Sequence, residues 1–170
     1  QIDHYTHRPL DCLRSTERLL DVARSAGHVQ AELDALGTLT GLHDLLGRGT
    51  DAVATGRAAR TLHRRLGDSL SARAQDLNLA YALLGSGHFG EALDLLESAL
   101  AYARRTAPAS LLSEGCQDML ADLWLTLGDP RRALDQINDD DSSGSSTRRQ
   151  HRIDLRARAA HQRGDTATAH

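Results

Sequence analysis

The chain has 170 residues, of which 40% are hydrophobic and 25% are charged, as is typical of a soluble globular protein. Its net charge is −3, so general affinity for nucleic acid or for an anionic membrane surface is not expected. All twenty basic side chains are arginine, which excludes a Schiff-base lysine and a Walker A lysine. Two cysteines, Cys12 and Cys116, do not make a disulfide framework, and we expect a cytoplasmic location.

Residue preferences favour helix throughout. Leu and Ala dominate, whereas Val and Ile contribute three residues each, and β-branched residues are the ones that strands use. The prolines Pro9, Pro108 and Pro130 fall where a helix could begin. No apolar run approaches the roughly 20 residues that a membrane-spanning helix needs. The sequence therefore predicts an all-α protein.

The predicted helices follow one another with short breaks. Residues 1–8 are expected to form an N-terminal tail ahead of a single helical domain over 9–170. Within that domain the segment 138–150, NDDDSSGSSTRRQ, offers nothing to bury and predicts a flexible loop. A ninth helix would begin near Asp165. The eight helices before it are expected at 9–25, 29–46, 50–65, 69–85, 89–105, 109–127, 130–138 and 148–163.

A glycine-centred turn recurs along the chain. The four copies are LLGRGTDAV (45–53), LLGSGHFGEAL (83–93), LTLGDPRRAL (125–134) and AHQRGDTATA (160–169). Their glycines are 40, 41 and 36 residues apart, and each is followed by an alanine in the next helix. Glycine ends a helix in the left-handed conformation, and a small alanine lets two helices pack closely. The pattern predicts a stack of antiparallel helical hairpins that share one core.

These residues resemble the tetratricopeptide-repeat (TPR) family. In the best match, residues 77–100, Leu79 and Ala80 occupy the large and small positions of the first helix, and Gly87 occupies the turn. The forty-residue spacing is similar to the longer repeats of large ATP-dependent bacterial transcription regulators of the maltose-activator type, and of helical regions that precede diguanylate cyclase domains. The resemblance implies a right-handed α-α superhelix of about four hairpins, a TPR-like solenoid.

The family binds partners mainly along a concave surface lined by the first helix of each hairpin. Carboxylates around apolar side chains would suit a basic or mixed peptide segment, although the same acids could simply be solvated. The carboxylate clamp of chaperone-binding members relies on lysines, which this chain lacks. Carried over by position, the groove comprises Asp34, Asp44, Leu77, Asn78, Tyr81, Leu84, Asp118, Asp122, Leu125, Asp154 and Arg158.

The leading interpretation is a non-enzymatic protein-interaction module that binds a peptide segment or a second copy of itself in this groove. It would need no cofactor and no direct contact with nucleic acid or membrane. The chain begins with Gln1 and ends within a helical pattern, so we expect a piece of a larger bacterial regulatory protein. The alternative is a domain that senses a small-molecule effector for a transcriptional or second-messenger regulator.

Possible metal chemistry rests on the histidines. His4 and His7 form an HxxH pair, and His43–Asp44 is similar to the dyad of metal phosphohydrolases, but no further ligand motif accompanies either. We therefore expect no functional metal and no catalytic residue, and a metal-dependent hydrolase is the weakest of three readings.

Two further residues have structural and functional interpretations. Cys116 is expected to be a buried, unreactive thiol, because no neighbouring feature would lower its pKa. Trp124 occupies a bulky packing position and is expected in the core, with an interface anchor as the alternative.

Overall fold

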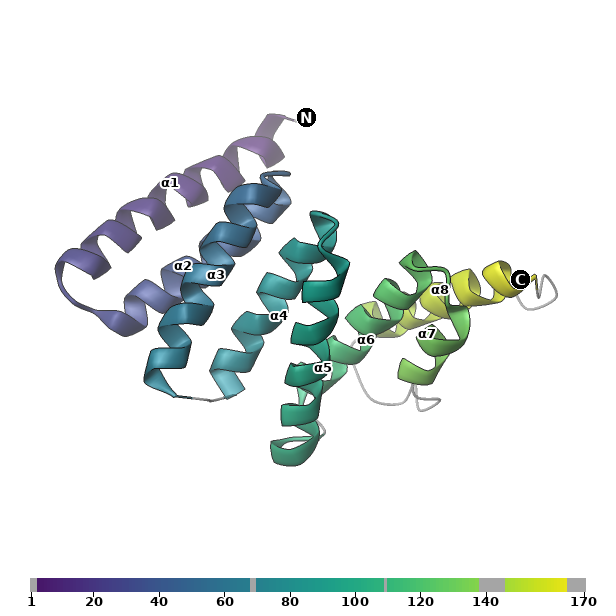
Figure 1. Ribbon diagram of the computed structural model, residues 1–170. Coiled ribbons are helices and arrows are strands. Elements are labelled where there is room, and N and C mark those ends of the chain that lie inside the picture. Colours follow the sequence, from purple (N-terminus) through teal and green to yellow (C-terminus); the bar gives the residue numbers. More distant parts are fainter. Residues whose placement is uncertain (1–2, 68–69, 109, 138–145, 165–170) are drawn as a thin grey trace. The chain divides into compact units, whose positions relative to one another are not determined.

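The structure is a computed structural model that describes residues 3–67, 70–108, 110–137 and 146–164, and side chains at 3–7, 70–71 and 146–147 are not among those described. The described ranges contain eight helices and no strand, so the predicted all-α fold is confirmed (Figure 1). The helices are α1 (Asp3–Ser25), α2 (Val29–Leu45), α3 (Gly49–Leu66), α4 (Leu70–Gly85), α5 (Phe89–Thr106), α6 (Leu111–Thr126), α7 (Pro130–Gln136) and α8 (Ser146–Arg163).

The first helix starts earlier than predicted. α1 begins at Asp3 and runs through Pro9, so residues 3–8 are helical and do not form a tail. Proline removes one backbone donor and crowds the preceding turn. In a helix of 23 residues the remaining hydrogen bonds outweigh that local loss. The expectation that Pro9 marks a helix start was therefore wrong, whereas Pro130 does open α7.

The predicted loop at 138–150 is also shorter than expected at its C-terminal end. Residues 146–150 form the first turn of α8, while 138–145 lie outside the described residues. Arg148 in this turn forms ion pairs with Glu114 and Asp118 of α6. These contacts favour helix where the local composition favoured a loop. The ninth helix near Asp165 likewise lies outside the described residues.

Four helix ends share one backbone arrangement. Gly27, Gly47, Gly87 and Gly128 have φ of +66°, +69°, +77° and +78°. At the second turn the Gly47 N–H donates to the Asp44 carbonyl at 2.9 Å, and the next N–H, that of Arg48, donates to the His43 carbonyl at 2.8 Å. The other three turns have the same pair of bonds, which satisfies carbonyls left free at a helix end. The turn at Gly27 has this geometry too, although it lies 20 residues before Gly47 and was not among the predicted copies of the repeat.

The helices pack in two compact units, residues 1–95 and 96–170, described separately here. In unit 1 each helix from α1 to α4 contacts the next, and α2 also contacts α4. In unit 2, α6 contacts α7, α7 contacts α8, and α6 contacts α8. Within each unit these successive helices therefore form hairpins, and first helices are neighbours, α2 with α4 and α6 with α8, as a TPR-like repeat requires.

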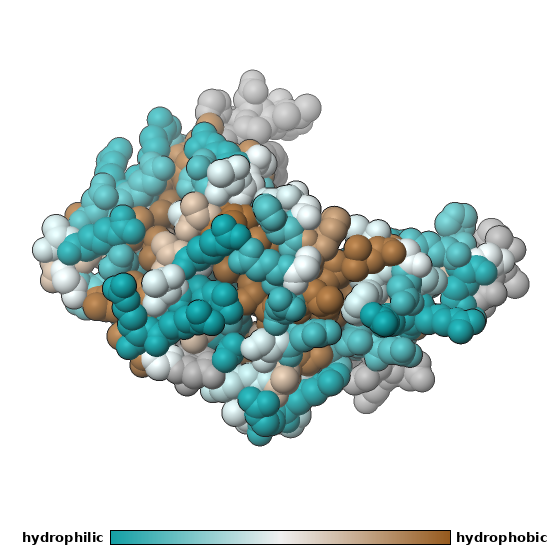
Figure 2. All heavy atoms as spheres, viewed as in Figure 1, coloured by the Kyte–Doolittle hydropathy of each residue, from teal (hydrophilic) through white to brown (hydrophobic). Residues whose placement is uncertain are grey.

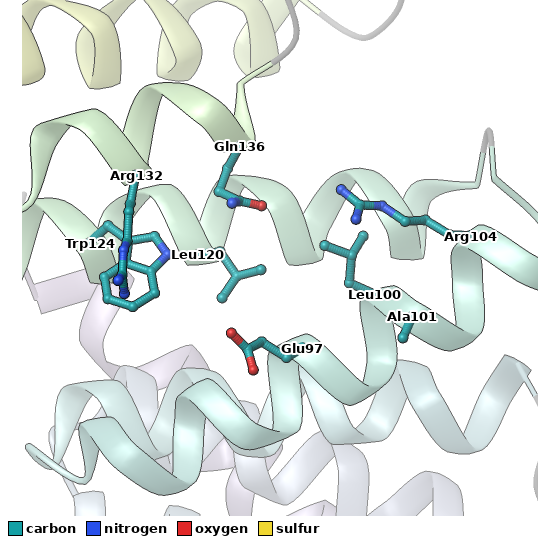
Figure 3. Close-up of a pocket in the computed structure, with 8 residues that line it drawn as sticks. All are labelled: Glu97, Leu100, Ala101, Arg104, Leu120, Trp124, Arg132 and Gln136. Atoms are coloured by element: carbon teal, nitrogen blue, oxygen red, sulfur yellow. The ribbon is translucent and has the colours of Figure 1, made fainter.

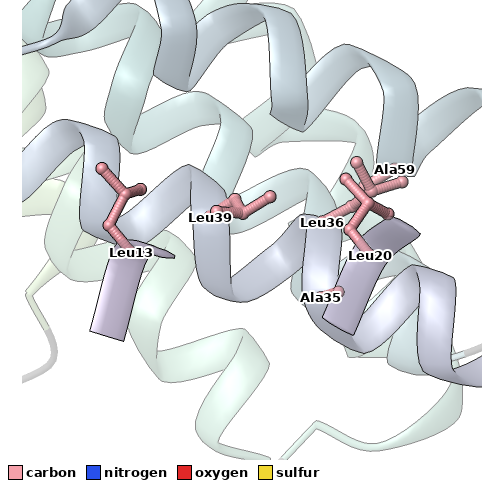
Figure 4. Packing of buried hydrophobic residues seen from close by; sticks show 6 residues of the cluster. All are labelled: Leu13, Leu20, Ala35, Leu36, Leu39 and Ala59. Carbon is pink, nitrogen blue, oxygen red and sulfur yellow. The ribbon is translucent and has the colours of Figure 1, made fainter. Parts of the chain in front are cut away.

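Each unit has its own apolar core. In unit 1 the core joins leucines of α1 and α2 with Ala59 of α3, and Figure 4 shows Leu20 and Leu36 beside Ala59. In unit 2 the core contains Ala121, Leu125, Ala133, Ile137, Leu155 and Ala159, which come from α6, α7 and α8. Full burial of one leucine stabilises a fold by about 1.5–3 kcal/mol, so these clusters hold the hairpins together.

The surface in view in Figure 2 is mainly hydrophilic, with hydrophobic residues visible between the polar ones. None of the described helices has the length and apolar character needed to cross a membrane.

Candidate interaction surfaces

The first predicted groove segment lies on α2 and α4. A Cβ placed on Gly37 of α2 would lie 2.6 Å from the side-chain amide of Gln75 on α4. A Cβ on Gly85 would lie 3.3 Å from Asp44 Oδ1. Both contacts advance in the same direction along the two helices. α2 and α4 are therefore parallel neighbours, and side chains on their outer faces form one surface.

This outer face consists of two exposed stripes with the same spacing. On both helices, exposed positions recur at intervals of four, three and four residues, which is the period of one helix face. Leu45 is 69% exposed and Tyr81 is 60% exposed, although the leucine side chain and the tyrosine ring are large and hydrophobic. We call this face the α2–α4 surface. Its residues are Asp34, Thr38, Gly41 and Leu45 of α2, with Ala74, Asn78, Tyr81 and Gly85 of α4.

The predicted groove residues of unit 1 divide between this surface and its floor. Asp34, Asn78 and Tyr81 belong to the surface, while Asp44, Leu77 and Leu84 are half-buried. The Asp34 carboxylate accepts a hydrogen bond from Gln30 Nε2 at 3.0 Å and is otherwise directed to solvent. None of the eight residues is basic, so the α2–α4 surface is acidic and partly apolar. The sequence reasoning missed Leu45, whose signal was its place eleven residues, or three helical turns, after Asp34.

The predicted acids of unit 2 are instead engaged by the chain itself. Asp118 of α6 accepts hydrogen bonds from Arg148 Nε at 2.7 Å and from Arg152 Nε at 3.0 Å, both on α8. Glu114 forms an ion pair with Arg148, and Asp122 accepts from Arg158 Nη1 at 2.7 Å. The acidic stripe of α6 is thus covered by an arginine stripe of α8, and we call this network the α6–α8 ion-pair ladder.

Burial shapes the electrostatics of the ladder. Desolvation raises the pKa of the Asp118 carboxyl above its ordinary 3.8, while the hydrogen bond and charge of Arg152 oppose that shift. Desolvation, together with the like charge of Arg152, lowers the pKa of Arg148 to about 10. Arg148 therefore keeps its positive charge near neutral pH, and the pairs of Arg148 and Arg152 have little access to water, whereas the pair of Asp122 and Arg158 is partly exposed.

Of the other two predicted groove residues of unit 2, one lies at the surface and one in the core. Asp154 is exposed and lies 3.8 Å from Arg158 on the same helix. Leu125 is 2% exposed and belongs to the core of unit 2, so its side chain does not line a groove. The prediction that Leu125 lines the groove was wrong, because the position carried over from the family falls on the buried face of α6.

A cavity of about 410 Å³ lies elsewhere in unit 2, between α5, α6 and α7. Its floor is apolar, with Leu100 and Leu120, and Figure 3 shows polar side chains around it. Trp124 is half-buried and lines this cavity, with the Arg132 guanidinium 4.6 Å from its ring centroid. The prediction of a core position for Trp124 was therefore only half right. The lining is completed by Glu97, Ala101, Arg104 and Gln136.

His43 and Cys116, which were considered for metal binding and thiol chemistry, are both buried. His43 is 7% exposed, with Nδ1 4.0 Å from Asp51 Oδ2, and Cys116 is fully buried as expected. Among the described side chains, no three of His, Cys, Asp or Glu are grouped as metal ligands would be. His4 and His7 lie outside the described side chains.

Comparison with known proteins identifies the fold. No family model matches the chain, and no curated protein matches it. Among solved structures, one similar chain is a putative kinesin light chain with nearly identical TPR-like repeats from Podosopora anserina, at 20% identity and a TM-score of 0.67, over 92% of this chain and 89% of that chain. Another is BtubC (BKLC) from P. vanneervenii, at 19% identity and a TM-score of 0.72, over 92% of this chain and 67% of that chain.

These likenesses cover nearly the whole chain at low sequence identity, and they agree with the repeated glycine turns and the contacts between alternate helices. The protein is a TPR-like helical repeat.

Proposed function

We propose that this chain is a non-enzymatic protein-interaction scaffold that binds a protein segment through the α2–α4 surface. The observation that carries the proposal is the pair of exposed side chains Tyr81 and Leu45 on parallel first helices. Exposed tyrosine is enriched among residues that dominate protein interfaces. Asp34 and the half-buried Asp44 add negative charge beside them, so the preferred segment is basic with an apolar anchor.

The finer features of the proposal have separate support. The bound segment could belong to a second copy of this chain, because a solenoid face of this kind serves either occupant. A place within a larger bacterial regulator of transcription or second-messenger signalling rests on the repeat spacing of about forty residues. A cytoplasmic location rests on the two cysteines, which make no disulfide framework.

The test uses the intact chain and a displayed library of random peptides, with sedimentation over a range of concentrations to measure self-association. We expect selected binders to be basic and apolar, or the chain to dimerise. In either case Tyr81→Ala should weaken binding at least about tenfold. Val22→Ala, which shortens an equally exposed apolar side chain on α1, is the matched control. Failure to select any peptide, together with a monomer at all concentrations, would overturn the proposal.

A further inference from the structure

The cavity of unit 2 carries a second inference, because its charges are arranged with opposite signs at its two ends. Glu97 and Arg104 both line it from α5. They are seven residues apart, which corresponds to about 10.5 Å along a helix. Figure 3 shows Glu97 and Arg104 at separate places along α5, with Leu100 and Ala101 between them.

The end near Glu97 has a net negative charge. Arg132 is also there, stacked on Trp124, but its Nε lies 3.4 Å from Asp129 Oδ2, so a nearby carboxylate balances its charge. The Trp124 ring is already stacked by Arg132, so Glu97 supplies the uncompensated negative charge of this end. A positively charged group from a ligand would therefore be favoured at this end.

The end near Arg104 is positive. The Arg104 side chain is exposed and, within the described part of the chain, neither it nor Glu97 forms an ion pair. Gln136 of α7 supplies an uncharged amide between the ends, and Figure 3 shows it directed toward the cavity. Between the charges, Leu100 and Leu120 offer an apolar floor that suits one aliphatic side chain.

We propose that this cavity binds an extended peptide segment of a partner protein in which an apolar residue lies two places after a basic residue and two places before an acidic one. Alternate side chains of an extended chain share one face, and the two charged residues are then about 13 Å apart, a distance that their long side chains can adjust to the separation of Glu97 and Arg104. The basic residue would lie at Glu97 beside Trp124, the apolar one on Leu100 and Leu120, and the acidic one at Arg104. This site lies on other helices than the α2–α4 surface and goes beyond the proposed function.

The experiment uses the fluorescence of Trp124, the only tryptophan of the chain. Three blocked heptapeptides are titrated into the intact protein: Gly-Arg-Gly-Leu-Gly-Glu-Gly, Gly-Arg-Gly-Leu-Gly-Arg-Gly and Gly-Glu-Gly-Leu-Gly-Glu-Gly. We expect the first to shift the emission and to bind about fivefold more tightly than either of the others, since each mismatch loses one exposed ion pair and gains a repulsion. Replacing its Leu by Ser should abolish the shift.

Reversing the charge of Arg104 or of Glu97 then tests which charged residue of the peptide lies at each end of the cavity. Arg104→Glu should make the peptide with two arginines the best ligand, and Glu97→Arg should favour the peptide with two glutamates. Arg105→Glu changes the neighbouring exposed charge, which does not line the cavity, and should leave the order unchanged. Equal binding of all three peptides, no binding at all by calorimetry, or the same switch in Arg105→Glu would overturn the inference. Since Tyr81→Ala leaves this cavity intact, loss of the α2–α4 function alone would not affect these titrations.

Discussion

Arg152 of α8 places its guanidinium Nε 3.0 Å from Oδ1 of Asp118 on α6, and the two side chains are 5% and 13% exposed. Asp118, which sequence reasoning assigned to solvent or to a partner, thus binds an arginine of its own chain. The pairing explains how α8 packs, since among the described side chains this helix contributes only Leu155 and Ala159 to the apolar core of unit 2. Charge, as well as apolar burial, fixes α8 on α6.

The first prediction concerns that pair. Asp118→Asn should destabilise the docking of α8 by about 3 kcal/mol, because it leaves the largely buried Arg152 without its countercharge. Hydrogen exchange of the α8 amides, compared with those of α6, measures the loss. Asp154→Asn, at an exposed carboxylate on α8, is the control and should change stability by no more than about 0.5 kcal/mol.

A double replacement separates charge from packing. If Asp118 and Arg152 are both changed to Leu, part of the protection of α8 should return, since a buried ion pair contributes little more than apolar residues of similar size, while Arg148 loses Asp118 but keeps Glu114 as a partner. Equal losses in the single and double variants would contradict this account.

The second prediction concerns pH. Burial lowers the pKa of His63 below its ordinary 6.5, while Asp76 and Asp34 act weakly in the opposite direction. Between the folded pKa and 6.5 the unfolded chain binds more protons than the folded chain, so stability rises with pH through this window. The contribution of neutral His63 is thus complete above pH 6.5 and is lost as the pH falls toward the folded value.

Urea unfolding at pH 7.5 and at pH 5.5 tests this. We expect His63→Gln to be less sensitive to the change in pH than the parent chain, even where its stability at pH 7.5 is lower from altered packing. A proton NMR titration of His63 should give a midpoint below 6.5. A midpoint above 6.5 would refute the sign of the effect.

The helices were predictable because each signal for them is local. The glycine at each turn and the periodic leucines act within a few residues, so most predicted helix bounds agree with the observed ones within two residues. The errors at Pro9 and at 146–150 arose where longer-range stabilisation outweighed a local preference.

The interaction surfaces were only partly predictable, because a side chain's exposure depends on which helices become neighbours. Asp118 and Arg152 are 34 residues apart in sequence, and nothing local indicates that they meet. Tyr81 could be placed on an outer face from its helical position alone, whereas the cavity beside Trp124 requires three helices to be in place.

The third prediction uses two glycines of one hairpin. Gly87 has φ of +77°, so Gly87→Ala should destabilise unit 1 by about 1–2 kcal/mol, because a Cβ is strained in the left-handed region. Gly90 lies inside α5, and a Cβ there meets no atom within 4 Å. Gly90→Ala should therefore stabilise the chain by about 0.5–1 kcal/mol, because alanine favours helix. Urea unfolding of the two variants compares them directly, and a loss of stability in both would show that open space at Gly90 was misassigned.

The last prediction concerns the alanines that lie five residues after the turn glycines Gly87 and Gly128. Ala92 and Ala133 are both 0% exposed, so a leucine at either position must displace its neighbours. Ala92→Leu and Ala133→Leu should each cost about 1–3 kcal/mol through overpacking. Ala54→Leu, on the exposed face of α3, adds the same atoms where there is room and should change stability by no more than about 0.5 kcal/mol. Thermal unfolding followed by circular dichroism distinguishes these outcomes. If the buried variants melted together with Ala54→Leu, the glycine turn and the alanine after it would not belong to one tightly packed repeat, and the spacing of about forty residues would have lost its physical basis.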